Sequence, residues 1–414
     1  MQVESQQVRW TDDKVQAEVR ILARKYQDNM VKFLREMIAI PSESGREEQV
    51  IARIRQEMEA VGFDEIKIDG MGNILGRVGS GKRVVAMDAH IDTVGVGNPE
   101  NWKVDPYQGA LKDGIVYGRG ASDQEAGMAA MVWGAKILKD LDLAGDCQVW
   151  ITGTVMEEDC DGLCWQYILK EKVLEPEVVV STEPTNLSVY RGHRGRMEIN
   201  VRTSGVSCHG SAPERGVNAV YKMAPIIAEI EKLNEDLVVG ADPFLGKGSV
   251  TISEIRSTSP SLCAVADSCT IHLDRRLTTG EDLAFAVSQI QQLPSVQKAG
   301  ADVVVLDYAE KAYTGLIYPT KKYYPTWLLP EDHSAVQAGV DAARIALETE
   351  PTVGKWIFST NGTATCGMFG IPTIGFGPAH EIHAHSVDDQ CPVEDLVRAA
   401  AFYAVFPAAW SSRA

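Results

Sequence analysis

The sequence predicts an α/β protein in which a mainly parallel sheet is interrupted by a smaller inserted α+β domain. Three observations predict it. Short apolar strands alternate with helical segments over the first 190 residues, which is typical of a parallel sheet. After about residue 190, two expected strands follow one another with no helix between them, and alternating strands and helices then return near the end of the chain. Finally, a chain of 414 residues is longer than a typical single domain.

The first domain is expected to begin with a helix and to continue as alternating strands and helices. Residues 13–39 space apolar side chains at helical intervals, and Pro41 ends the pattern. Two short strands are expected around the glycine-rich turn within residues 66–78. The further expected elements are a buried strand in residues 83–94, a helix over 125–141, and strands within 147–158 and 177–184.

The pattern changes near residue 191 and predicts an inserted domain. The expected elements are a strand over 196–205, a helix over 216–233, strands over 248–255 and 268–277, a helix from Glu281 and a strand over 301–308. This β-α-β-β-α-β order is typical of a split βαβ, or ferredoxin-like, sandwich. A strand within 371–378 and a helix from Val393 then return to the first fold. We expect residues 1–190 and 316–414 to form one domain and residues 191–315 the other.

Composition narrows the class of protein. Lys and Arg number 40 against 57 Asp and Glu, so the net charge of −17 argues against a nucleic acid or an anionic membrane as partner. No apolar run is long enough to span a bilayer, and the first residues lack the apolar core of a signal peptide. Eight scattered cysteines without a CxxC pair fit reduced thiols. A cytoplasmic enzyme is therefore expected.

Acidic residues and a histidine stand where the expected parallel strands end, at the edge of such a sheet where ligands bind. They are His90, Asp92, Glu157, Glu158 and Glu183. Asp123 adds a carboxylate in a glycine-rich turn just before the helix over 125–141. Converging carboxylates repel one another unless they are protonated or bind cations. Carboxylates with an imidazole and no thiolate suit zinc or a similar divalent ion.

Five short motifs occur in one order along nearly the whole chain. They are His90-Ile-Asp92-Thr93, GRGASDQEAGMAA around Asp123, MEED at 156–159, STEPT at 181–185 and AHSVDD at 384–389. This ordered set resembles the M20 metallopeptidases. The resemblance is to the branch containing acetylornithine deacetylase and succinyl-diaminopimelate desuccinylase, and within it to hydrolases linked to selenium metabolism.

The resemblance implies a catalytic domain of the zinc-hydrolase type with two zinc ions per subunit, for which cobalt could substitute. His90, Asp123 and Glu183 would bind one ion, and Asp123, Glu158 and His385 the other. Asp92 would lie behind His90 and orient its ring. Glu157 would be the general base for a hydroxide that bridges the two ions.

The resemblance also implies roles in the inserted domain, which would act as a lid and as the dimerisation domain of a homodimer. His209 would stabilise the oxyanion in the partner subunit's site. Arg276 would bind a substrate carboxylate, while its neighbour Arg275 would be solvated. Asn361, Gly362 and Thr363 would lie near the substrate. The chain departs from the family pattern at Cys263 and Ala266, and at Asp389, where Glu is commoner.

These observations lead to one expected function and two alternatives. We expect a hydrolase that cleaves an amide bond of an N-acyl amino acid or short peptide carrying a free carboxylate. A carboxypeptidase-like or carbamoyl-amide hydrolase could use the same site. A relative that only binds a ligand is the alternative from another class, although it would not need the complete set of ligands and base.

Overall fold

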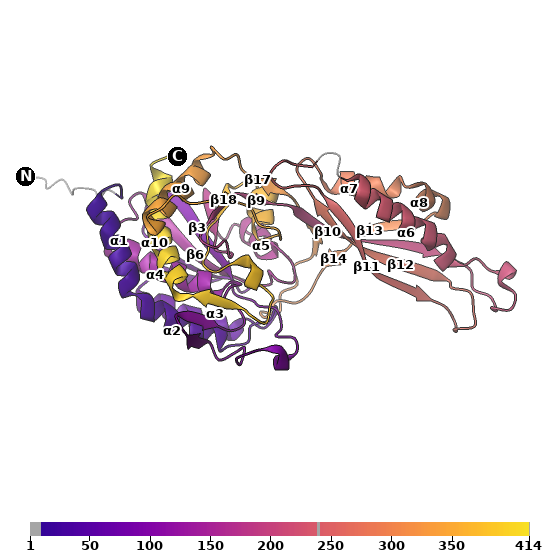
Figure 1. Cartoon of the computed structure of the whole chain (residues 1–414), viewed down its shortest axis with the longest axis horizontal. Coiled ribbons are helices and arrows are strands. Elements are labelled where there is room, and N and C mark those ends of the chain that lie inside the picture. The colour runs from indigo at the N-terminus through magenta and orange to yellow at the C-terminus, as the bar shows by residue number, and fades with distance from the viewer. Residues whose placement is uncertain (1–9, 238–240, 414) are drawn as a thin grey trace, which may run out of the picture.

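The structure is a computed structural model that describes residues 10–237 and 241–413. It has two lobes, shown in Figure 1. The N-terminal and C-terminal parts of the chain together form one lobe, and the middle of the chain forms the other, elongated lobe. The predicted fold class, a mainly parallel α/β domain carrying an inserted α+β domain, is confirmed.

The first lobe contains an eight-stranded sheet with a parallel centre. β3 pairs in parallel with β6 and β7, and β19 continues in parallel beside β7. In spatial order the strands are β1 (Glu65–Ile68), β2 (Ile74–Val78), β6 (Cys147–Thr154), β3 (Arg83–His90), β7 (Val178–Ser181), β19 (Thr373–Gly375), β8 (Val189–Tyr190) and β18 (Val353–Gly354). The parallel centre brings the carboxyl ends of β3, β6 and β7 to one edge.

Helices cover this sheet. They are α1 (Asp13–Lys25), α2 (Gln27–Ile38), α3 (Glu48–Val61), α4 (Glu125–Asp140), α5 (Leu163–Lys170), α9 (Ser334–Leu347) and α10 (Val393–Ser411). Almost all of α4 is buried between β3 and α10. Small residues permit this close packing: a Cβ at Gly134 would lie 2.9 Å from the main-chain oxygen of Ala400 on α10. The helix that begins two residues after Asp123 is therefore held rigidly.

The single helix expected over 13–39 is two helices that meet at Tyr26. The Tyr26 backbone leaves the helical region with ψ near 6°. Its ring packs against Trp133 at 5.0 Å between centroids, and its hydroxyl donates to Asp140 at 2.6 Å. These contacts with α4 outweigh the continuous helical pattern of the sequence.

The second lobe has the predicted β-α-β-β-α-β order. Its elements are β10 (Gly195–Ser204), α6 (Ala219–Asp236), β11 (Ser249–Thr258), β12 (Ser268–Leu277), α7 (Leu283–Gln291), α8 (Pro294–Ala299) and β13 (Asp302–Val305). The strands lie in the order β11-β12-β10-β13, and β16 (Tyr323–Tyr324) adds to β10. A separate apolar core lies between this sheet and its helices.

Arg275 corrects an expectation about β12. Every second residue of this strand is buried, and the burial includes Arg275, whose side chain has no exposed surface. Its guanidinium donates to Glu281 at 2.8 Å and to Gln289 at 3.1 Å. The expected solvated side chain is therefore wrong, because the strand's alternation points Arg275 inward and Arg276 outward.

Short strands and helical turns complete the structure. The strands are β4 (Ala110–Lys112), β5 (Ile115–Tyr117), β9 (Gly192–His193), β14 (Asp307–Tyr308), β15 (Thr320–Lys321), β17 (Trp327–Leu328) and β20 (Gln390–Pro392). The turns are η1 (Pro99–Asn101), η2 (Pro213–Arg215), η3 (Thr363–Met368) and η4 (Glu381–His383). β20 pairs with β5, which brings the segment after His385 beside the segment before Asp123. Among the described residues, none of the helices is both long and apolar enough to cross a bilayer.

Candidate metal centre

His90 is presented at the end of β3 with one ring nitrogen free to face a ligand. Its Nδ1 lies 2.8 Å from the main-chain oxygen of Asp92. A carbonyl oxygen can only accept, so Nδ1 carries the proton and Nε2 of the neutral ring keeps its lone pair. Nε2 lies 3.0 Å from Oδ1 of Asp123. The ring is thus oriented as a metal ligand requires.

Asp92 anchors the two glutamates that follow β6. Its carboxylate accepts hydrogen bonds from the main-chain N–H groups of Glu157 at 3.2 Å and Glu158 at 3.0 Å, and from the Ser44 hydroxyl at 2.6 Å. The same carboxylate lies 3.6 Å from Nδ1 of His90. Asp92 therefore orients His90 mainly through its main-chain oxygen, and its side chain positions Glu157 and Glu158.

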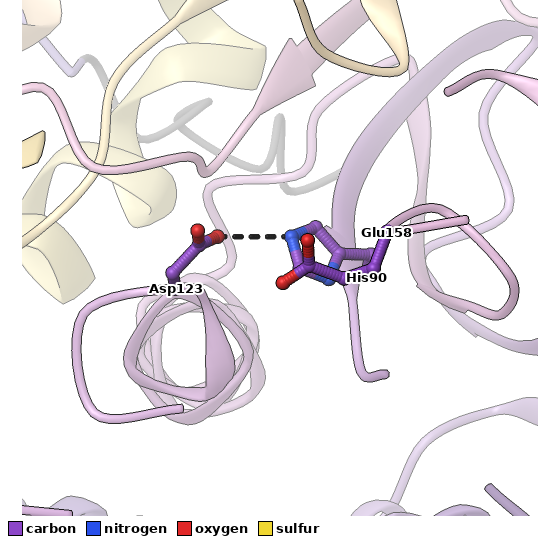
Figure 2. A group of neighbouring side chains, drawn as sticks. All are labelled: His90, Asp123 and Glu158. Carbon is purple, nitrogen blue, oxygen red and sulfur yellow. Dashed lines mark hydrogen bonds and ion pairs between the residues drawn. The ribbon is translucent and has the colours of Figure 1, made fainter. Parts of the chain in front are cut away.

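Two groups of ligand atoms converge beyond the strand ends. Each group has its atoms within 4.8 Å of one another: His90, Asp123 and Glu158 form one, and His90, Glu157 and Glu183 the other. Figure 2 shows the carboxylate of Asp123 facing the imidazole of His90, with Glu158 close to the ring.

Asp123 stands between two histidines. One of its oxygens, Oδ1, faces His90, and the other, Oδ2, lies 3.4 Å from Nε2 of His385. His385 also lies 2.8 Å from Oε2 of Glu158. On the other side, Oε1 of Glu183 lies 3.6 Å from Nε2 of His90. The two ligand groups within the described residues thus have His90 in common, and Asp123 lies between His90 and His385.

The electrostatics of these residues fit bound cations. Burial, reinforced by neighbouring carboxylates, raises the pKa of Glu157 and Glu183 well above their usual values. Burial lowers the pKa of His90, but the charges of Glu157 and Glu183 outweigh it and raise that pKa overall. Among the described residues, Oε1 of Glu157, Oε1 of Glu158 and Oε2 of Glu183 are buried without a hydrogen-bond partner. Orphaned carboxylate oxygens beside imidazoles suit zinc or a similar divalent ion.

A cavity of about 370 Å³ opens onto these side chains. Besides the predicted metal residues it is lined by Asp161, Arg196, Arg276, Phe358, Ser359, Glu381 and Ala384. Arg276 donates to both oxygens of Asp274, at 2.8 and 3.0 Å. Larger hollows of about 570 and 450 Å³ lie over α1 and α9 and contain no such ligand group in the described part of the chain.

Sequence reasoning missed three charged residues of this cavity: Asp161, Arg196 and Glu381. Arg196 and Asp161 lie 3.2 Å apart and form an ion pair that joins the two lobes. Neither Arg196 nor Asp161 falls in a motif with its own chemistry. Glu381 was within reach, because it stands four residues before His385 in the segment His380-Glu381-Ile382-His383-Ala384-His385.

The predicted loop at 361–363 lies beside the cavity floor rather than on the cavity lining. Asn361 is buried and donates from Nδ2 to Asp88 at 2.8 Å, while its Oδ1 accepts from the main-chain N–H of Gly162 at 2.9 Å. Gly362 packs against the ring of Trp327, and the Thr363 hydroxyl donates to a main-chain oxygen. Substrate contacts by these three residues stay a prediction.

His209 lies far from the cavity of its own chain. The length of β10 alone separates the cavity residue Arg196 from Ser204 by roughly 25 Å, and His209 follows beyond it. His209 is exposed, and its Nδ1 contacts the hydroxyl of Ser211 at 2.7 Å. It lies in the segment between β10 and η2.

Comparison with known proteins identifies relatives over most of the chain. The model of peptidase family M20/M25/M40 matches residues 86–408. The Escherichia coli K12 protein named "Uncharacterized protein YgeY" is 55% identical over 388 residues, covering 94% of this chain and 96% of that protein.

Two enzymes with a named activity match about half of the chain. A probable succinyl-diaminopimelate desuccinylase of Staphylococcus epidermidis RP62A is 27% identical over 210 residues, covering 50% of this chain and 52% of its own. An acetylornithine deacetylase of Proteus mirabilis HI4320 is 28% identical over 220 residues, covering 50% and 56%.

Solved structures share the fold. Aminopeptidase PepT of Bacillus cereus superposes with a TM-score of 0.71 at 18% identity, covering 93% of this chain and 99% of that one. The YXEP protein of Bacillus subtilis, described as a dinuclear metal binding peptidase, gives a TM-score of 0.70 at 12% identity, covering 94% and 100%. At these identities the likeness shows the two-lobed fold.

Proposed function

The chain belongs to peptidase family M20/M25/M40, and from that membership we propose a metal-dependent hydrolase that cleaves an amide bond of an N-acyl amino acid or short peptide. The observation that carries the proposal is the convergence of two histidines and four carboxylates on one cavity, with three carboxylate oxygens left unpartnered within the described residues. Both named relatives, a desuccinylase and a deacetylase, release an acyl group from a small amino acid.

Two adjacent ion sites are proposed. His90, Asp123 and Glu183 would hold one ion, and Asp123, Glu158 and His385 the other, with Asp123 shared through its two oxygens. The description of the Bacillus subtilis neighbour as a dinuclear metal binding peptidase supports this count. Two divalent cations held there, zinc or a substitute such as cobalt, would lower the pKa of water between them and polarise the scissile carbonyl.

Glu157 is the proposed general base. It lines the cavity, its Oε2 lies 3.9 Å from Nε2 of His90, and its Oε1 has no partner in the described part of the chain. A carboxylate oxygen of Glu157 would accept the proton of the attacking water and later deliver it to the nitrogen of the leaving amine. Its neighbour Glu158 points to His385 instead, so the two adjacent glutamates divide ligation and proton transfer.

Arg276 is the proposed binding residue for the substrate carboxylate. Its guanidinium lines the cavity and is already arranged in a bidentate contact with Asp274. A substrate carboxylate would accept the same planar pair of donors. A homodimer is proposed in which His209 of the inserted domain reaches the second subunit's cavity and stabilises the developing oxyanion.

The test uses the purified chain, its metal content and a panel of acyl amino acids and dipeptides. Replacement of Glu157 by Gln should keep both ions and lower kcat by about 10²- to 10⁴-fold, because only proton transfer is lost. Exhaustive chelation should abolish turnover, and zinc or cobalt should restore it. An unchanged rate in the fully loaded Glu157→Gln variant would overturn the assignment, and so would fewer than one ion per chain in a metal-replete sample.

A further inference from the structure

Glu381 is a charged residue of the cavity for which the proposed chemistry has no use. It begins the turn η4 and lines the same cavity as Glu157, Arg276 and His385. Its side chain is only partly exposed, and the atom Oε2 is buried without a hydrogen-bond partner among the described residues. Burial raises the pKa of this carboxylate, and the neighbouring His380 opposes that rise.

The arginines of the cavity are already paired with other carboxylates. Arg196 lies 3.2 Å from Asp161, and Arg276 contacts both oxygens of Asp274. Within residues 10–237 and 241–413, no lysine, arginine or histidine forms an ion pair with Glu381. A partly buried carboxylate without a cation is costly, so a ligand that supplies the cation would relieve that cost.

A charge count singles out the same residue. Two divalent ions, as in the proposed function, would be balanced by the four carboxylates of Asp123, Glu157, Glu158 and Glu183. The pairs Arg196 with Asp161 and Arg276 with Asp274 are each neutral. Among the described residues that line the cavity, Glu381 is thus the carboxylate that faces neither a proposed ion nor an arginine.

We propose that Glu381 binds a cationic group of the substrate, an ammonium or a guanidinium, while Arg276 binds its carboxylate and the scissile amide lies between them at the ions. The substrate is then a zwitterionic amino acid derivative rather than a purely anionic one. A cavity of about 370 Å³ is at the lower end for ligand pockets and fits a single amino acid with a small acyl group, or a dipeptide. The inference rests on the proposed function for its two cations and its scissile bond.

The first test compares substrates that differ by one charge. One pair is Nα-acetyl-L-ornithine and Nα-acetyl-L-norvaline, and another is glycyl-L-alanine and its N-acetylated form. A charge-assisted contact of about 1.5–3 kcal/mol corresponds to roughly a 10- to 100-fold advantage in kcat/KM for the cationic member of at least one pair. Glu381→Gln should remove that advantage and leave the anionic member, which lacks the ammonium group, within about threefold of the wild-type value.

The matched control is Asp388→Asn, which removes an exposed carboxylate of the same segment that pairs with Lys103 at 2.8 Å outside the cavity. It should leave the preference unchanged. If wild-type protein hydrolyses both members of each pair equally well, or if Glu381→Gln lowers both equally, the assignment of Glu381 is overturned.

A binding measurement separates this inference from the proposed function. Calorimetry would follow the same four compounds binding to zinc-loaded Glu157→Gln protein, with and without Glu381→Gln, with the melting temperature as a check on folding. A cationic preference of about tenfold or more that disappears with Glu381→Gln supports the inference even if no amide is hydrolysed. Hydrolysis without any such preference overturns the inference and leaves the proposed function standing. Glu381→Ala should repeat the result if the glutamine variant is unstable.

Discussion

At the scale of single residues, Asp92 connects the two halves of the candidate centre. Its main-chain oxygen fixes the tautomer of His90, and its carboxylate accepts the N–H groups of Glu157 and Glu158. Met156, just before these glutamates, has a positive φ of 65°, which is unfavourable for a residue with a long side chain. The hydrogen bonds to Asp92 help to keep this strained turn in place.

Replacement of Asp92 by Ala should therefore weaken both the ligand set and the base. We expect about a 10- to 100-fold loss in metal affinity or in kcat, as is typical when the partner of a metal ligand is removed. Ser44→Ala is the matched variant, because it removes one contact at 2.6 Å to the same carboxylate and leaves the others. Metal retention during dialysis against a chelator and kcat would be measured for both. Equal, small losses in the two variants would contradict this role for Asp92.

Glu47 predicts a pH dependence of stability. It is fully buried, and Oε1 accepts the N–H groups of Gly45 and Met156, while Oε2 has no partner among the described residues. Burial and then the charge of Asp92 raise the pKa of Glu47 from 4.5 to about 8. The folded state thus binds the proton more tightly than the unfolded state, so stability falls as the pH rises through this window.

Glu47→Gln keeps an acceptor at Oε1 and cannot ionise. In metal-free protein, the melting temperature of Glu47→Gln minus that of wild type should increase as the pH rises from about 5 to about 9. Glu48→Gln changes the exposed next residue, the first of α3, and should show no such trend. A difference between Glu47→Gln and wild type that is flat with pH would contradict the assigned pKa shift.

Sequence spacing locates residues at strand ends better than residues in loops. His90, Glu157 and Glu183 could be grouped because parallel strands end at one edge, and the structure brings them together at 3.6–3.9 Å from the His90 Nε2 atom. Arg196 and Glu381 reach the cavity from a neighbouring lobe and from an irregular turn. No periodicity relates such positions, so only the folded chain shows that they share a cavity with Glu157.

At the scale of elements, the strand and helix order was predictable and local interruptions were not. The alternation along β12 already implies that Arg275 and Arg276 point to opposite faces, yet the expectation made Arg276 the binding residue and left Arg275 in solvent. The break between α1 and α2 depends on contacts of Tyr26 with Trp133 and Asp140, which lie more than a hundred residues away. Long-range contacts of this kind leave no mark on local helical spacing.

One element pairing joins the two ends of the candidate site. β20 pairs with β5, and next to it the buried carboxylate of Asp389 accepts hydrogen bonds from Arg119 at 2.9 Å, from the Gly120 N–H at 2.9 Å and from the Ser122 hydroxyl at 2.6 Å. Ser122 precedes the proposed ligand Asp123, and Asp389 follows His385 by four residues. Asp389, where the family more commonly has Glu, thus links the segment after His385 to the segment before Asp123.

Asp389→Asn should destabilise the protein and loosen metal binding. The amide would face donors with its own N–H₂ group and would leave Arg119 buried without its counter-charge, at a cost of about 3–5 kcal/mol. Thermal unfolding and metal content would be measured beside Asp388→Asn, whose exposed carboxylate is outside this network. A melting temperature equal to that of wild type would show that Asp389 does not hold the two segments together.

At the scale of the whole molecule, the two lobes divide the proposed chemistry between chains. The candidate cavity is lined by the strand ends of the first lobe and by Arg196 and Arg276 of the second, whereas His209 follows the other end of β10. Contacts between the lobes surround the segment after Glu158: the Tyr308 hydroxyl donates to Asp159 at 3.2 Å, and Arg196 pairs with Asp161 at the same distance. These contacts hold the inserted lobe beside Glu157 of its own chain, and the proposal assigns His209, which follows the far end of β10, to another chain.

Complementation between two inactive variants tests this arrangement. Glu157→Gln and His209→Ala homodimers should each lose most of their activity, because one lacks the base and the other lacks the oxyanion partner. In a mixed dimer, one cavity combines the intact Glu157 of one chain with the intact His209 of the other. If subunits mix at random, half of the dimers are mixed and each has one intact cavity, so about a quarter of wild-type activity should return.

Size-exclusion chromatography with light scattering would establish the dimer, and activity would be followed during subunit exchange at constant total protein. Because a single chain cannot bring its own His209 to its own cavity in this structure, a His209→Ala variant that stays fully active, or mixtures that stay inactive although the subunits exchange, would exclude His209 as a contribution from the partner.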